Sequence, residues 1–224
     1  MTKKELGKRY IFFIIGLLFS GIGVAVTKRG ELGVSPISSV ANVMSYKLPD
    51  LTLGSWLLIW NCVLLLGQII LLRRDFKLIQ LLQIPLSVLF GWFTDFGVWI
   101  AGRLPNQNYA ERMFLVLLGI AILALGITLT VIADVVMNSG EALVKAISEV
   151  SGKSFGFVKV GFDISCVIIA VILSFIFFDG KLIGTREGTI IAALLTGTLV
   201  KVWQGLVKEP VINMLTDKEF GTRV

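Results

Sequence analysis

The sequence contains no histidine and only two cysteines. The absence of histidine removes the commonest metal ligand and proton shuttle. Cys62 and Cys166 each lie alone among aliphatic residues, which excludes a disulfide framework and a CxxC metal motif and indicates core packing. No HExxH, Walker A or GxSxG motif occurs. We therefore expect neither an enzyme nor a bound cofactor or metal ion.

Charged residues are also scarce, at 16% of the 224 residues, whereas hydrophobic residues make up 55%. A soluble domain usually carries about 25% charged residues. The apolar residues form blocks long enough to cross a bilayer, which takes about 20 residues in a helix. These proportions exclude a soluble domain and predict an all-α integral membrane protein. The net charge of +6 does not indicate nucleic-acid binding, because the basic residues flank the apolar blocks.

Six apolar blocks are predicted to span the bilayer, three in residues 10–102 and three in residues 113–207. A polar linker, residues 103–112, joins the two halves, and residues 1–9 and 208–224 form polar tails. In the third span, Pro85 is expected to kink the helix. The predicted spans are Tyr10–Val26, Leu51–Leu72, Leu78–Gly102, Met113–Ala133, Ser154–Phe178 and Gly188–Val207.

The first and fourth spans carry small residues about one helical turn apart. They are Gly16, Ser20, Gly21 and Ala25 in the first span, and Gly119, Ala121, Ala124 and Gly126 in the fourth. Small residues at this spacing allow helix backbones to approach closely inside a membrane. Both spans are therefore predicted to present a close-packing face.

Each half also contains a segment that is too short and too polar to span. Ser35 followed by Pro36 is a good helix start, because it offers a hydroxyl N-cap and then proline, and helical spacing continues to about Tyr46. In the second half, Asn138 and Glu141 resemble a capping box, which predicts a helix to about Val150. Each short helix could re-enter the membrane or lie flat at its interface.

The two halves can be aligned as an internal duplication. Identity is low, and the glycine and aliphatic patterns common to multipass proteins offer an alternative explanation. The alignment places Glu31 on Asp134, Ser35 on Asn138, Thr52-Leu53-Gly54 on Ser154-Phe155-Gly156, Asn61 on Asp163, and Gly91-x-x-x-Asp95 on Gly197-x-x-x-Lys201.

The basic residues outside the spans favour a cytoplasmic position for both termini. With the N-terminus inside, the cytoplasmic side collects twelve of them: Lys3, Lys4, Lys8, Arg9, Arg73, Arg74, Lys77, Lys145, Lys153, Lys208, Lys218 and Arg223. The outer side collects seven: Lys28, Arg29, Lys47, Arg103, Arg112, Lys181 and Arg186. Three spans per half then make the two repeats inverted, as in secondary transporters with a site near the midplane.

Ionisable residues inside the spans are candidates for charge coupling. Such a side chain at mid-membrane costs about 2.5–3.5 kcal/mol, so each needs a partner or an aqueous cavity. Asp163 lies near the middle of its span, and Lys159 lies one turn earlier on the same helix face, so the two can pair. Asp163 is the first choice, with Lys159, Asp95, Asp134 and Lys201 as further candidates. A buried structural ion-pair network is the alternative.

The predicted substrate-binding residues surround the starts of the two short helices, where free N–H groups favour an anionic or hydrogen-bond-accepting group. Glu141 is expected to act as a helix cap instead of contacting an anion. The predicted set comprises Ser35, Ser38, Asn61, Asn138, Ser139, Glu141 and Asp163.

The leading hypothesis is a small secondary transporter for a small anionic or zwitterionic solute, acting alone or as a homodimer. One alternative is a non-transporting regulatory or scaffold subunit, which would have a packed interior without a water-accessible cavity. Another is the substrate-binding component of a multi-subunit importer. The first span lacks the Ala-x-x-x-Ala coupling signature of such components, which disfavours this reading.

The segment Leu32-Gly33-Val34-Ser35-Pro36, followed by Thr52-Leu53-Gly54, resembles the bacterial YitT/YczE-like family of small multipass membrane proteins. That family typically shows an acidic residue, an LG-x-S-P-like turn and a [Ser/Thr]-apolar-Gly helix start. Glu31 stands where an aspartate is common, and Lys153-Ser154-Phe155-Gly156 and Gly184-Thr185 extend the resemblance, which covers residues 10–207. The resemblance implies a bacterial plasma-membrane protein and adds little chemistry.

Overall fold

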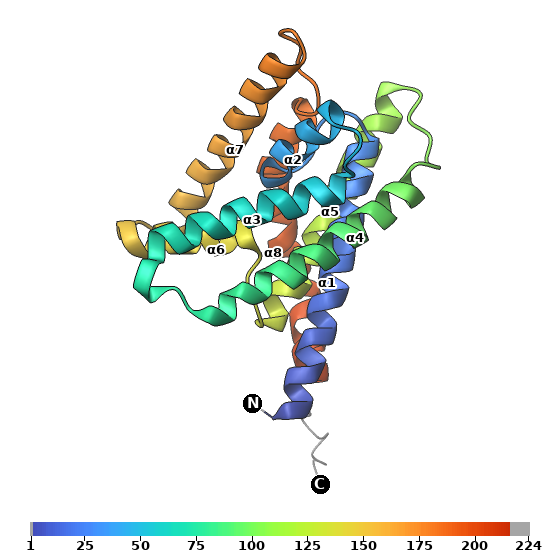
Figure 1. Cartoon of the computed structure of the whole chain (residues 1–224). Helices are drawn as coiled ribbons and strands as arrows, with labels where there is room; N and C mark the ends of the chain where they lie inside the picture. The colour runs from blue at the N-terminus through green and yellow to red at the C-terminus, as the bar shows by residue number, and fades with distance from the viewer. Residues whose placement is uncertain (1, 216–224) are drawn as a thin grey trace.

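The computed structural model describes residues 2–215, which form α-helices, two 3-10 helices and no strands (Figure 1). Six of these helices are long and apolar enough to cross a membrane. The predicted all-helical, multipass architecture is therefore confirmed. The long helices are α1 (Lys3–Arg29), α3 (Leu53–Leu72), α4 (Gln83–Ala101), α5 (Tyr109–Ala133), α7 (Phe155–Phe177) and α8 (Glu187–Leu215). The short helices are α2 (Pro36–Lys47), α6 (Ser139–Ser151), η1 (Arg73–Asp75) and η2 (Leu78–Leu82).

Several helix boundaries differ from the sequence prediction. Helix α1 begins at Lys3, inside the predicted tail, and α8 continues to Leu215 through Pro210. Residues 216–224 of the second predicted tail lie outside the described residues. Pro85, the predicted kink position, lies in the first turn of α4, directly after the 3-10 helix η2, where its missing N–H needs no partner.

Helices α1 and α5 pack against each other along their length and form the centre of the fold. A methyl group on Gly23 would overlap the backbone of Leu123, and one on Gly126 would overlap the backbone of Ser20. The two backbones are therefore in direct contact. Of the predicted small residues of the first span, Gly16 and Ser20 lie at this contact, whereas Gly21 meets Phe93 and Thr94 of α4. In a bilayer such contact matters more than apolar burial, because lipid is as apolar as a leucine side chain.

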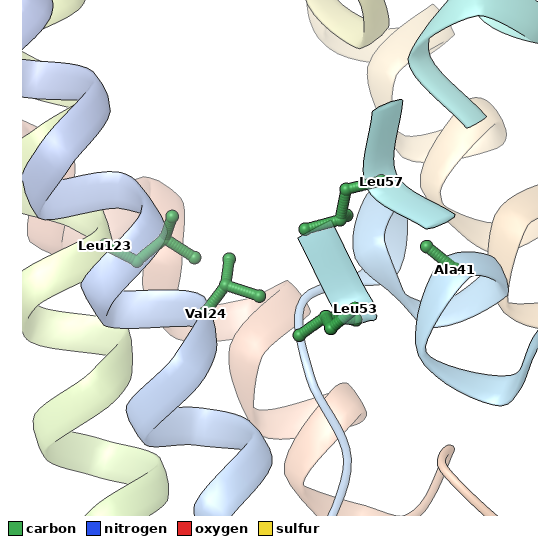
Figure 2. Close-up of a cluster of buried hydrophobic side chains, with 5 residues drawn as sticks. All are labelled: Val24, Ala41, Leu53, Leu57 and Leu123. Carbon is green, nitrogen blue, oxygen red and sulfur yellow. The ribbon is translucent and has the colours of Figure 1, made fainter. Parts of the chain in front are cut away.

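The remaining helices surround this central pair. Helix α4 packs on α1 and α8 packs on α5, whereas the short helices α2 and α6 each contact both α3 and α7. Figure 2 shows where α1, α2, α3 and α5 meet, around a buried cluster of Val24, Ala41, Leu53, Leu57 and Leu123. Helix α3 also packs closely on α4, but α7 does not pack on α8 and extends away from it (Figure 1).

Candidate functional site

The first turns of the two short helices contact each other inside the bundle. Gly140, in the first turn of α6, is buried, and a side chain there would come within 3.0 Å of Ile37 Cδ1 in the first turn of α2. The two interruptions in the sequence therefore meet at one place in the fold.

Ser35 and Asn138 occupy the N-cap positions of α2 and α6, but neither side chain makes a capping hydrogen bond. Ser35 Oγ donates to Ser38 Oγ at 3.0 Å instead. The expected capping box of Asn138 and Glu141 is wrong, because the side chain of Asn138 makes no capping hydrogen bond. Both side chains instead line open spaces next to the helix start, which are described below. The backbone N–H groups of these first turns thus lack side-chain caps from Ser35 and Asn138.

A small hollow lies beside the start of α6, with a volume of about 10 Å³, close to the space of one water molecule. It brings together three of the predicted substrate-binding residues, Asn61, Asn138 and Ser139. The rest of its lining is Phe13, Gln83, Leu86, Ser87, Phe90 and Met137.

A larger cleft of about 420 Å³ lies next to this hollow and shares Gln83, Met137 and Asn138 with it. Its volume falls in the range of small-molecule sites. The cleft lies between the α3–α4 connection, the end of α5 and helix α6, and its charged lining carries both signs. The charged residues are Asp75, Asp134, Glu141 and Glu149 on the acidic side and Lys77 and Lys145 on the basic side.

A buried pair of amides holds the start of α6 in place. The Nε2 groups of Gln68 and Gln83 each donate to the other's Oε1 at 3.1 Å, and Gln68 Nε2 also donates to the carbonyl oxygen of Ser139 at 3.0 Å. This network ties α3, α4 and α6 together under the cleft. We did not predict it, although a lone glutamine inside an apolar span such as Gln68 is a signal for an interhelical hydrogen bond.

Asp163 lines neither the small hollow nor the cleft. Both of its carboxylate oxygens accept hydrogen bonds from Lys159 Nζ, so the predicted pairing is present. The two side chains are 20% and 28% exposed, so this pair is only partly shielded. Burial raises the pKa of the Glu141 carboxyl, while the nearby Lys159 lowers it and Asp163 raises it further. The three charges therefore influence one another across the α6–α7 contact.

The other charge-coupling candidates have different surroundings. Asp95 accepts hydrogen bonds from Thr52 Oγ1 and from the backbone N–H of Gly54, which makes it a cap for α3. Asp134 is exposed at the end of α5 in a left-handed conformation, at φ +49°. Lys201 is exposed on α8 and makes no ion pair with the described residues. Within residues 2–215, no group of three or more His, Cys, Asp or Glu side chains could hold a metal ion.

Comparison of the sequence with known proteins places this chain in a family. Residues 7–205 match the model of a family of unknown function, DUF6198. The chain belongs to this family. The chain is similar to the uncharacterized membrane protein YczE of Bacillus subtilis (strain 168), with 28% identity over 200 residues, covering 89% of this chain and 86% of that protein.

The chain is also similar to the uncharacterized protein YyaS of the same strain, with 23% identity over 205 residues, covering 89% of this chain and 94% of that protein. No solved structure gives a significant match. The predicted YczE-like membrane family is thus confirmed, and the chain is a multipass membrane protein. The family description names no activity, so a functional assignment depends on the chemistry of the site.

Proposed function

We propose that this protein is a secondary transporter for a small zwitterionic solute such as an amino acid. The observation that carries the proposal is the meeting of α2 and α6. The starts of α2 and α6, both without side-chain caps, contact each other through Ile37 and Gly140. The start of α6 also borders a small hollow that adjoins a cleft of about 420 Å³, whereas no residue of α2 lines either one. Helix starts that converge inside a membrane protein are typical of transporter sites.

The pairwise packing of the helices supports two inverted repeats. The contact of α1 with α4 has a counterpart in that of α5 with α8, and the contact of α2 with α7 has one in that of α6 with α3. The ends of the chain also adjoin, because Lys8 Nζ donates to the carbonyl oxygen of Met214 at 3.1 Å. Together with the distribution of basic residues, this favours a bacterial plasma-membrane protein with both termini in the cytoplasm.

The chemistry of the lining favours a zwitterion over a simple anion. The first turns of α2 and α6 present N–H groups and partial positive charge, which suit a carboxylate. The four carboxylates of the cleft, against two lysines, suit an ammonium group. In this proposal Ser35, Ser38, Asn61, Asn138 and Ser139 hold the solute. Asp163, coupled electrostatically to Glu141, carries the proton or cation that moves with the solute.

The test is uptake of a mixture of radiolabelled amino acids into proteoliposomes containing the purified protein. We expect uptake above that of empty liposomes, and we expect Asp163→Asn to reduce it at least about tenfold, the loss that 1.4 kcal/mol would produce. Asp50→Asn, which changes an exposed loop residue between α2 and α3, is the control and should keep full uptake. Uptake by Asp163→Asn equal to that of the wild type would contradict a coupling role for Asp163. No uptake of any amino acid would contradict the transporter proposal.

A regulatory or scaffold subunit is the second candidate. It would need neither the cleft nor the polar hollow, so cysteine accessibility distinguishes it from a transporter. Single cysteines placed from Asn138 to Asp163 should react with a water-soluble maleimide deep into this stretch in a transporter. Protection throughout, with a co-purifying protein, would favour the scaffold. A homodimer stays a prediction, which native mass measurement in detergent would test.

A further inference from the structure

Helices α3 and α4 are joined by a seam in which two glycines touch. A methyl group on Gly54 would overlap the carbonyl oxygen of Gly91, so the two backbones are in direct contact. Asp95, one turn after Gly91, completes the seam by accepting the N–H of Gly54 at 2.8 Å and the hydroxyl of Thr52 at 2.7 Å. The carboxylate therefore satisfies the start of α3 while holding it against α4.

The aligned residues of the second half form no such seam. Gly156 on α7 and Gly197 on α8 correspond to Gly54 and Gly91, and both face open space with no atom within 4 Å of an added methyl group. Ser154, which corresponds to Thr52, makes no capping hydrogen bond. In these two helices only 17% and 6% of the most apolar stretch is buried.

The residue that corresponds to Asp95 is Lys201, which carries the opposite charge. A carboxylate accepts N–H groups and is attracted to the positive start of a helix. An ammonium group has no acceptor and is repelled from the same place. Lys153, just before the start of α7, adds to this repulsion. Asp95 therefore holds the first seam together, whereas its counterpart Lys201 cannot accept the N–H groups at the start of α7.

We propose that α7 and α8 form a second seam, closing Gly156 onto Gly197, which Lys201 holds open in the conformation described. This inference rests on the proposed inverted repeats and extends the proposed transport function. In an inverted-repeat transporter, alternating access arises when one repeat moves against the other around a fixed site. In one conformation of such a cycle the α3–α4 seam is closed and the α7–α8 seam is open. In the opposite conformation the α3–α4 seam is open and the α7–α8 seam is closed.

The test uses a disulfide between α7 and α8. In a background with Cys62→Ala and Cys166→Ala, Gly156→Cys and Gly197→Cys are combined, and a protease site is inserted between Gly180 and Lys181 in the connecting loop. A disulfide requires Cα atoms about 4.4–6.8 Å apart, so oxidation reports closure of the seam. After proteolysis, an intrachain disulfide keeps the two fragments together on a non-reducing gel.

We expect slow oxidation with Lys201 present and a rate at least about 5-fold higher with Lys201→Asp, since reversing the charge turns repulsion into capping. The matched control pairs Gly161→Cys with Gly197→Cys. Gly161 also faces open space. Its counterpart Ile59 is 41% exposed and lies about 140° around α3 from Gly54, the residue that contacts α4. This control pair should stay slow with either residue at position 201.

Several outcomes would overturn the inference. They are an unchanged rate in Lys201→Asp, an equal rate in the control pair, absence of any disulfide, and a disulfide between two chains, which would assign this face to a second copy. Oxidation does not depend on a solute. An oxidation rate that depends on the charge at position 201, without amino-acid uptake, would therefore support the second seam and contradict the transport proposal. Uptake with an oxidation rate that does not depend on this charge would support transport and contradict the second seam.

Discussion

Asp95 on α4 accepts the backbone N–H of Gly54 on α3 at 2.8 Å, so one carboxylate both caps α3 and fixes it to its neighbour. Replacing Asp95 with alanine should lower the free energy of unfolding by about 0.5–2 kcal/mol, as loss of an N-cap does elsewhere. Thermal unfolding in detergent would measure the loss.

Asp50→Ala, in the exposed loop before α3, is the control and should leave the melting temperature unchanged. A double-mutant cycle with Thr52→Val should show coupling, since Thr52 Oγ1 donates to the same carboxylate at 2.7 Å. Additive effects of the two changes would argue against the shared cap.

The aligned glycines Gly54 and Gly156 should respond in opposite ways to alanine. In Gly54→Ala the new methyl group overlaps the backbone of Gly91 and cannot be relieved by a rotamer change, so the protein should unfold at a markedly lower temperature. In Gly156→Ala the methyl group meets no atom within 4 Å, and the helix should gain up to about 1 kcal/mol from better propensity. A similar loss of melting temperature in both variants would contradict the observed packing.

The ion pair of Lys159 and Asp163 should behave as a unit. Lys159→Met alone leaves a carboxylate without its partner inside a span, so we expect lower expression and a lower melting temperature. Adding Asp163→Leu removes the stranded charge and should restore both quantities to near the wild-type values. The comparison is made by fluorescence size-exclusion chromatography of the single and double variants. Loss of fold in the double variant but not in the single one would reverse this interpretation.

Glu141 should make stability depend on pH. Burial raises the pKa of its carboxyl in the folded protein, so the folded state favours the protonated acid. Stability from this group is then fully present below the unfolded pKa and is lost as pH rises toward the raised folded pKa. Glu141→Gln removes that loss, so its melting temperature should exceed that of the wild type near pH 8 and match it near pH 4.

Glu149→Gln is the matched control for this prediction. Glu149 lies on the same helix and lines the same cleft, but its side chain is 59% exposed and faces Lys145 at 4.0 Å. Its replacement should give no pH-dependent gain. A gain as large as that of Glu141→Gln would attribute the effect to the net charge of the cleft.

The sequence allowed the helices to be predicted, but not all of their contacts. The apolar blocks gave the spans, and Ser35-Pro36 and Asn138 gave the two short helices. The predicted substrate-binding set includes Asn61 and Asn138, and both line the small hollow beside the start of α6. Local propensity and spacing were sufficient for the spans and the short helices.

The remaining features depend on which helices are neighbours. The pairing of Gln68 with Gln83 requires α3 and α4 to lie side by side, and the position of a single glutamine in the sequence does not identify its partner. The N-cap positions could be predicted, but the direction of the Asn138 side chain depends on a hollow formed by α1, α3 and α4. Asp163 has a counterpart in Asn61 in the alignment, yet α7 stands away from α8 and the two side chains have different surroundings.

The glycine contact between α1 and α5 also constrains how the chain is assembled. Helix α1 enters the membrane first, but α5, which contacts Gly16, Ser20 and Gly23 of α1, is made only after α2, α3 and α4. Until then this face must be covered by lipid or by the insertion machinery. Neither half of the chain can therefore reach its native packing alone, whereas two halves produced as separate chains in the same cell contain everything needed to join.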